Sequence, residues 1–381
     1  MITTIRLYAY GVFLVLFCSF GFGNNVSAAD SVPVTIAVVG LVHGHIDGFL
    51  NQLAAHPEVT LVGIAEPDMA LRQKYAEKAH LSENLFFSSE AAMLDKTHPQ
   101  AVLVYTSAAG HRAAIEEAVK RHIPVMVEKP LCTTVEDALA IRSLSEKFHV
   151  PVLTNYETTW YTSNRAAADL LASGRIGDLR KLVIHDGHRG PKEIGVQPEF
   201  LKWLTDPQQN GAGALFDFGC YGADLATFLM HGELPLTVTA VTQQIKPDVY
   251  PHVDDEATIL LTYPHTQVII QASWNWPFER KDMEVYGATG YVDTVKSDRL
   301  RVRLPGENEE HIETPPPLAA PQDNSLNYLS AVLQNRLQPQ NDLTSLDTNV
   351  TVVRILDAAR RSASAGHTVR LKQNGPPDSN H

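Results

Sequence analysis

Three side chains of this 381-residue chain have the types and the neighbours that proton-transfer chemistry requires. Lys129 stands in the tripeptide Glu128–Lys129–Pro130, and Asp217 and Tyr221 lie four residues apart in a glycine-rich stretch. An ammonium, a carboxylate and a phenol that surround a hydroxyl group can exchange its proton and stabilise charge on its oxygen. Oxidation of a secondary alcohol needs such groups beside a hydride acceptor, so the chain must also offer a site for one.

These side chains are expected on two regular elements. The run Val125–Val127 is apolar and mostly β-branched, which predicts a short buried strand that ends just before Lys129. The carboxyl end of such a strand is where open α/β sheets bind their ligands. If the glycine-rich stretch is helical, Asp217, Tyr221 and Asp224 share one face of the helix because of their spacing. A buried polar network with a purely structural role is the alternative for that face.

Strands and helices are predicted to alternate from residue 34 onward. Thr133 and Glu136 have the spacing of a capping box at the start of one of the helices. The repeat predicts an α/β fold with a doubly wound parallel sheet and helices on both faces. The predicted strands are Val34–Val39, Val59–Ala65, Ala101–Tyr105 and 124–127, and the predicted helices are 46–55, 111–121 and 133–148.

The turn after the first strand is a partial dinucleotide-binding motif. Gly40 supplies the first glycine of G-x-G-x-x-G, whereas Val42 and His45 replace the other two. Glu66, at the end of the next strand, stands where a ribose-binding carboxylate belongs, and it favours NAD over NADP by repelling a 2′-phosphate. A turn without a role in cofactor binding is the alternative. His43 and His45 lack further ligands at a recognisable spacing, so we predict no metal site.

The pattern changes after residue 153. Asn155–Tyr161 is polar and aromatic, and it either binds a sugar-like ligand or simply crosses between domains. A strand that opens near Leu182–His185 is followed by a long loop, and such loops are usually functional or mobile. Further strands are predicted over 237–242, 257–263, 267–273 and 283–286, and helices over 325–335 and 346–363, the last ending at Gly366.

The order of these motifs resembles the Gfo/Idh/MocA family, which includes glucose-fructose oxidoreductase and inositol dehydrogenase. The resemblance rests on the Gly40 turn, Glu128–Lys129–Pro130 and Asp217-x-Gly219-x-Tyr221-x-x-Asp224, and it covers nearly the whole chain after the first 30 residues. It implies an N-terminal Rossmann domain over 33–153 and a C-terminal α/β domain over 154–372 with a large, mainly antiparallel open sheet. The helices of 325–364 would pack back on the body, and 373–381 would form a disordered tail.

The resemblance also implies roles for the three side chains. The lysine and the helix aspartate of the family match Lys129 and Asp217. Most members have histidine where this chain has Tyr221, whereas the glucose-fructose oxidoreductase branch resembles this chain in having tyrosine. A free tyrosine has a pKa near 10, and we expect Lys129 to favour its phenolate. Tyr221 is therefore the predicted acid/base, Lys129 its electrostatic partner and hydroxyl anchor, and Asp217 the orienting group. Lys129 and Tyr221 could exchange these roles.

The predicted activity is an NAD(P)-dependent oxidation of a secondary CH–OH group in a sugar or polyol, with NAD preferred. Two alternatives stay open: an NAD-dependent glycoside hydrolase that oxidises its sugar transiently, and a non-catalytic sugar-binding relative. The predicted substrate contacts are Asn155, Tyr156, Arg189, Asp217 and Tyr221. The predicted cofactor contacts are Gly40, Val42, His43, Gly44, His45, Glu66, Thr106, His111, Glu128 and Lys129.

The first 29 residues have the features of a Sec-type signal peptide. Arg6 precedes the apolar run Gly11–Phe20, and Val26–Ala29 offers small residues to a signal peptidase. We prefer cleavage and export to the periplasm over a retained membrane anchor. Free NAD is scarce there, so the cofactor would have to stay bound and be regenerated in each cycle.

Composition limits the partners of the mature chain. The full chain has a net charge of −12, and cleavage would remove only Arg6 among its charged side chains. An acidic chain of this kind disfavours nucleic acid and anionic membranes as partners, so a small-molecule substrate is expected. Copies of the chain are expected to associate through the C-terminal sheet. Only Cys132 and Cys220 remain after cleavage, and whether they form a disulfide is left open.

Overall fold

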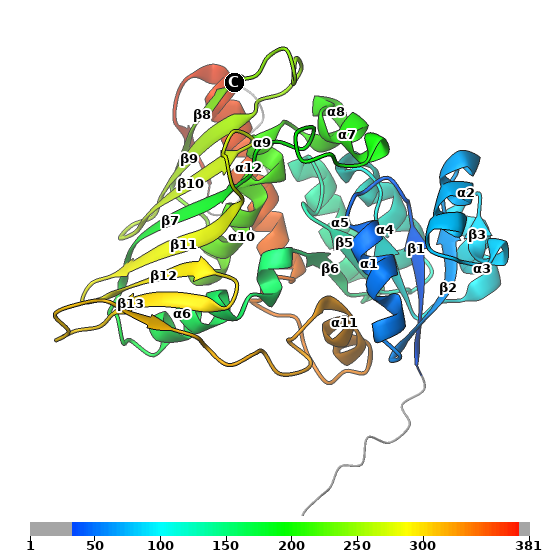
Figure 1. The fold of residues 1–381 in the computed structure, drawn as a ribbon, viewed down its shortest axis with the longest axis horizontal. Helices are drawn as coiled ribbons and strands as arrows, with labels where there is room; N and C mark the ends of the chain where they lie inside the picture. The colour runs from blue at the N-terminus through cyan, green and yellow to red at the C-terminus, as the bar shows by residue number, and fades with distance from the viewer. Residues whose placement is uncertain (1–32, 373–381) are drawn as a thin grey trace, which may run out of the picture. The chain divides into compact units, whose positions relative to one another are not determined.

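The computed structural model describes residues 33–372 (Figure 1). The predicted signal peptide and the predicted disordered tail lie outside these described residues. Within 33–372, no helix combines the length and the apolar character that a membrane crossing needs.

The N-terminal part is built on six parallel strands, as predicted. Their order is β3-β2-β1-β4-β5-β6, so the direction of winding reverses between β1 and β4 and leaves a crevice at the carboxyl ends there. Central strands such as β5 are buried along their whole length, which explains their continuous apolar runs. The strands are β1 Val34–Val39, β2 Val59–Ala65, β3 Phe86–Phe87, β4 Ala101–Val104, β5 Val125–Glu128 and β6 Val152–Asn155.

Helices cover both faces of this sheet. One face packs against α1 Ile46–Gln52, α2 Met69–Lys78 and α11 Ser325–Leu333, the last arriving from far along the chain. The other face packs against α3 Glu90–Thr97, α4 His111–Val119, α5 Val135–Phe148 and the first turns of α12 Leu346–Ala365.

The start of α5 differs from its prediction by one residue. Thr134, and not Thr133, is the N-cap, and its hydroxyl accepts a hydrogen bond from the N–H of Asp137 at 3.1 Å. The predicted capping box with Glu136 was therefore wrong. Two adjacent threonines precede two adjacent acids, so the sequence alone left the register undecided.

The C-terminal part is a nine-stranded, mainly antiparallel sheet, which confirms the predicted fold class. Its order is β14-β13-β12-β11-β7-β10-β9-β8-β15, and only β7 and β10 pair in parallel among the strands described. The strands are β7 Leu179–Gly187, β8 Thr237–Gln243, β9 Glu256–Thr262, β10 Gln267–Ser273, β11 Arg280–Gly287, β12 Tyr291–Lys296, β13 Arg299–Arg303, β14 His311–Glu313 and β15 Val369–Arg370.

One face of this sheet is covered by helices, and the other carries none among the described residues (Figure 1). The covering helices include α6 Thr162–Ala172, α10 Gly219–Leu229 and the rest of α12. Alternate strand residues are buried beneath them, for example Val268 and Ile270 in β10. Because α10 lies close on the strands, a Cβ at Gly222 would overlap the side chain of Ile270.

Candidate active site

A buried ion pair joins the two parts of the chain at the predicted site. The Nζ of Lys129, just beyond β5, lies 2.6 Å from Oδ1 of Asp217 and donates to the Asp217 carbonyl oxygen at 3.0 Å. The indole N–H of Trp274 donates to the other carboxylate oxygen at 2.9 Å. Burial opposes both charges, but mutual attraction outweighs it, lowering the pKa of Asp217 and raising the pKa of Lys129. The pair is therefore ionised at neutral pH.

The helix that carries Asp217 is broken, contrary to the prediction of one continuous helix. Asp217 ends the short helix α9 Ala214–Asp217, and Phe218 separates it from α10. Asp217 and Tyr221 nevertheless line the same cavity. Asp224 is fully buried, has no hydrogen-bond partner for its carboxylate among residues 33–372, and does not line the cavity beside Asp217.

Tyr221, on α10, lies beside the ion pair. The Nζ of Lys129 is 4.9 Å from the centre of its ring, and the Nζ of Lys281, on β11, is 5.5 Å away. Burial raises the pKa of Tyr221 well above its ordinary value, and the Glu157 carboxylate raises it further. This direction is opposite to the one expected from Lys129 alone, because burial and neighbouring carboxylates outweigh that ammonium. Tyr221 is a neutral phenol at pH 7.

A cavity of about 230 Å³ brings these groups together. Lys129, Asp217 and Tyr221 line it, together with Gly44 and His45 of the N-terminal part. Several residues that line this cavity were not predicted from the sequence, notably His188, Phe200, Glu279 and Lys281. The long loop after β7 was a usable signal for His188. Nothing local marks Lys281, which reaches the cavity because it shares the covered face of β11 with Met283 and Val285.

The predicted substrate residues outside α9 and α10 do not lie together. Asn155 donates to Glu128 at 3.0 Å and accepts from the Trp160 indole at 3.1 Å. Tyr156 is fully buried, and its ring packs edge-on against Tyr221 at 5.5 Å, so it supports the site from behind. Arg189 is exposed and does not line the cavity.

The predicted dinucleotide groove begins at the end of β1. Gly40 has φ +86°, and a Cβ there would lie 2.7 Å from Thr106, so only glycine suits this turn. The Glu66 carboxylate accepts from the N–H groups of Leu41 and Asp68, both at 2.9 Å, and thereby fixes the turn. A second cavity of about 370 Å³ adjoins Gly40, Val42, Glu66 and Thr106. A carboxylate beside a close glycine turn fits the adenosine half of NAD.

His111 serves the turn after Lys129. It is fully buried at the start of α4, and its Nδ1 lies 3.0 Å from the carbonyl oxygen of Pro130, to which it donates. Burial lowers the pKa of His111 to about 4, so the ring is neutral. This contact makes His111 a support for the loop that carries Lys129.

The fold places the Glu128 carboxylate close to the two histidines of the first turn. His43, His45 and Glu128 offer ligand atoms within 4.8 Å of one another. However, Glu128 already pairs with Nδ1 of His45 at 2.9 Å and with Asn155, and Nδ1 of His43 accepts from the His45 N–H at 3.2 Å. The prediction of no metal stays a prediction.

Two short helices of the C-terminal part pack on the N-terminal part. They are α7 Pro198–Leu204, which packs on the first turn, and α8 Pro207–Asn210, which packs near Ser107 after β4. The Trp203 indole donates to the Val42 carbonyl at 3.0 Å, and the Phe200 ring lies 5.0 Å from that of His43. A Cβ at Gly44 would come within 2.8 Å of Phe200. The backbone of the first turn is therefore covered.

Elsewhere, Cys132 and Cys220 are both buried free thiols.

A parallel sheet with a glycine turn and a carboxylate, facing a lysine–aspartate pair, defines the class of NAD-binding Rossmann oxidoreductases. Residues 34–156 match the family described as "Oxidoreductase family, NAD-binding Rossmann fold", and residues 164–293 match the "GFO/IDH/MocA C-terminal domain". The chain belongs to the Gfo/Idh/MocA family of oxidoreductases.

Named relatives are similar over most of the chain. D-apiose dehydrogenase of Rhizobium rhizogenes is 25% identical over 342 residues, which is 84% of this chain and 94% of that protein. The dTDP-3,4-didehydro-2,6-dideoxy-alpha-D-glucose 3-reductase of Streptomyces antibioticus is 27% identical over 62% of this chain and 68% of its own. Aldose-aldose oxidoreductase from Caulobacter crescentus shares the fold, with a TM-score of 0.75, 24% identity, and coverage of 89% and 100%.

Proposed function

We propose that this protein interconverts a secondary alcohol and a ketone in a sugar or polyol, with NAD bound in the N-terminal part. The observation that carries the proposal is the cavity in which Lys129, Asp217 and Tyr221 meet. Its volume of about 230 Å³ suits one sugar unit. The apiose dehydrogenase and sugar-nucleotide reductase relatives support the substrate class.

Gly40, Glu66 and Thr106 would hold NAD, which when bound would supply the hydride acceptor and donor. Lys129, fixed by Asp217, donates a hydrogen bond to the substrate oxygen and favours negative charge on it. Tyr221 holds the proton that a carbonyl oxygen receives on reduction, and in oxidation the hydroxyl proton passes to its phenolate. Because Tyr221 is a neutral phenol at pH 7, the resting site is set for reduction.

The test uses the purified protein and the absorbance of its bound nicotinamide. Free sugars should generate the reduced cofactor, and a second carbonyl compound should consume it. The stripped protein should bind NAD more tightly than NADP because of Glu66. Tyr221→Phe should slow turnover by at least about a hundredfold and leave NAD binding intact, since only the proton carrier is lost. Release of the aglycone from aryl glycosides without net cofactor reduction would point instead to glycoside hydrolysis.

We also propose export to the periplasm, which the composition of residues 1–29 supports. Cell fractionation and N-terminal sequencing of the mature protein test it. Recovery of the full-length chain in the cytoplasm would contradict it, and would remove the need for a cofactor that is regenerated in place.

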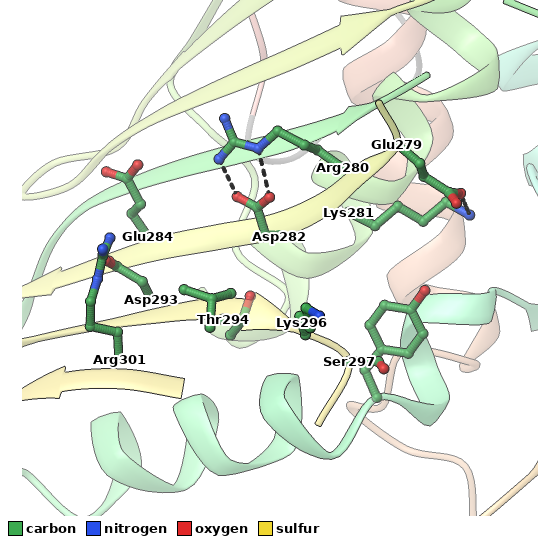
Figure 2. A pocket seen from close by; sticks show the side chains of 12 residues that line it. Glu279, Arg280, Lys281, Asp282, Glu284, Asp293, Thr294, Lys296, Ser297 and Arg301 are labelled. Atoms are coloured by element: carbon green, nitrogen blue, oxygen red, sulfur yellow. Dashed lines mark hydrogen bonds and ion pairs between the residues drawn. The ribbon is translucent and has the colours of Figure 1, made fainter. Parts of the chain in front are cut away.

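Association of copies through the open face of the C-terminal sheet is proposed on the character of that face. Some of its charges are paired within the chain, as with Arg280 and Asp282 at 2.7 Å (Figure 2). Val183, Ile269 and Leu260 form a row across three neighbouring strands, on the face opposite the buried residues. Ile269→Lys should reduce the mass measured by light scattering. An unchanged mass would exclude this face.

A further inference from the structure

His188 is fixed at the cavity by its backbone. It follows β7 directly, its N–H donates to the Ser273 carbonyl at 3.0 Å, and its carbonyl accepts from the Trp276 N–H at 3.1 Å. Its side chain lines the same cavity as Lys129, Asp217 and Tyr221. The residue therefore belongs to the rigid end of the sheet rather than to the loop that follows.

The imidazole of His188 is fixed as well. Its ring meets Phe218 edge-on, with 4.8 Å between centres and an angle of 89°. The N–H of Gly190 donates to Nδ1 at 2.9 Å. A ring nitrogen that accepts a hydrogen bond carries no proton, so in the neutral ring the proton is on Nε2. With Nδ1 engaged by the backbone, Nε2 is the ring nitrogen left for a ligand.

The surroundings of His188 keep it neutral. Burial lowers its pKa, the Asp217 carboxylate opposes that shift, and Lys281 lowers the pKa again. Glu279 and Lys129 also face it, with opposite effects. Protonation of Nδ1 would also require breaking the hydrogen bond from Gly190. The ring is therefore mainly neutral at pH 7, and its Nε2–H is a donor.

We propose that His188 is a further catalytic residue whose Nε2–H donates a hydrogen bond to the reacting oxygen of the substrate. This inference rests on the proposed function. A neutral imidazole is a suitable electrophile, because it polarises a carbonyl without placing a further full charge beside Lys129. The donor is oriented before the substrate arrives, so it stabilises developing oxyanion charge without reorganisation.

The test compares two variants of His188 with a control. His188→Phe keeps the packing on Phe218 and removes the donor, and should lower kcat by about 10²–10³, as loss of one oxyanion donor does. His188→Gln supplies an amide N–H, and its kcat should be at least about tenfold higher than that of His188→Phe. The exposed His252→Gln should be unchanged. NAD binding should be equal in all four proteins.

A spectroscopic readout does not depend on turnover. The ¹⁵N spectrum of labelled imidazole should show the Nε2–H tautomer of His188 as the main form from pH 7 to 8. A kcat of His188→Phe within threefold of wild type, or an Nδ1–H or doubly protonated ring as the main form at pH 7 to 8, would overturn the proposal while wild-type activity stands. A wild type that converts no sugar or carbonyl compound refutes the proposed function, and the role of His188 with it.

Discussion

At the scale of single residues, the site depends on charges that are removed from water. Lys129 and Asp217 are each only 5% exposed, so their attraction and hydrogen bonds must offset the cost of burying both ions. Such pairs contribute little net stability, but loss of one partner leaves an uncompensated charge. The arrangement positions an ammonium for chemistry rather than stabilising the fold.

Asp217→Asn should therefore destabilise the protein by about 3–5 kcal/mol at pH 7, and Lys129→Met with Asp217→Asn should recover most of that loss. The folded pKa of Asp217 is lowered, so its contribution is present above the unfolded pKa and is lost as pH falls through the folded one. Urea unfolding from pH 3 to 8 measures this. An equal gap between wild type and Asp217→Asn at every pH would contradict it.

The raised pKa of Tyr221 leads us to expect different pH dependences for oxidation and for reduction. Its pKa is raised above the ordinary value of about 10, so the phenolate is scarce at pH 7 and becomes more abundant as pH rises. Oxidation of the alcohol should accelerate from pH 7 to 10, and carbonyl reduction should not. Steady-state rates in both directions with wild type and Tyr221→Phe measure this. An oxidation rate that is flat with pH would assign the base to another group.

At the scale of elements, sequence patterns predicted what local physics determines. The strands β1, β2, β4 and β5 were found because buried parallel strands are continuous apolar runs. The strands β12 to β15 were missed because they are short and carry many charged residues, which resemble loops. The break at Phe218 and the position of Lys281 depend on packing between distant segments, and no local pattern encodes them.

The close approach of α10 to its sheet gives a stability prediction. Gly222→Ala places a methyl group against Ile270 and should destabilise the protein by about 1–3 kcal/mol, with a loss of activity because Tyr221 is adjacent. Gly48→Ala in α1 is the matched control, since a Cβ there meets nothing within 4 Å. That change should be neutral or stabilising by up to about 1 kcal/mol. Equal stabilities of the two variants, by urea unfolding, would refute the packing argument.

At the scale of the whole molecule, the segment Gln197–Asn210 connects the two parts over the dinucleotide turn. Glu199 pairs with Lys74 of α2 at 2.5 Å, and Gln209 accepts from Ser107 at 2.8 Å. Gln197 is hydrogen-bonded to Asp47 of α1. Together with Phe200 and Trp203, these contacts cover the turn on which the NAD pyrophosphate should lie. We therefore expect the segment to slow the release of a bound cofactor.

The last prediction follows from that cover. Phe200→Ala combined with Trp203→Phe removes the ring over His43 and the hydrogen bond to Val42. If these contacts retain bound NAD by more than about 1.4 kcal/mol, NAD should dissociate at least about tenfold faster from the double variant. Displacement of bound NAD by a fluorescent analogue measures the rate. Lys202→Ala, on the exposed side of α7, is the control. If wild type, control and double variant all exchange equally fast, the segment does not retain the cofactor, and the proposed export would require another way to keep it.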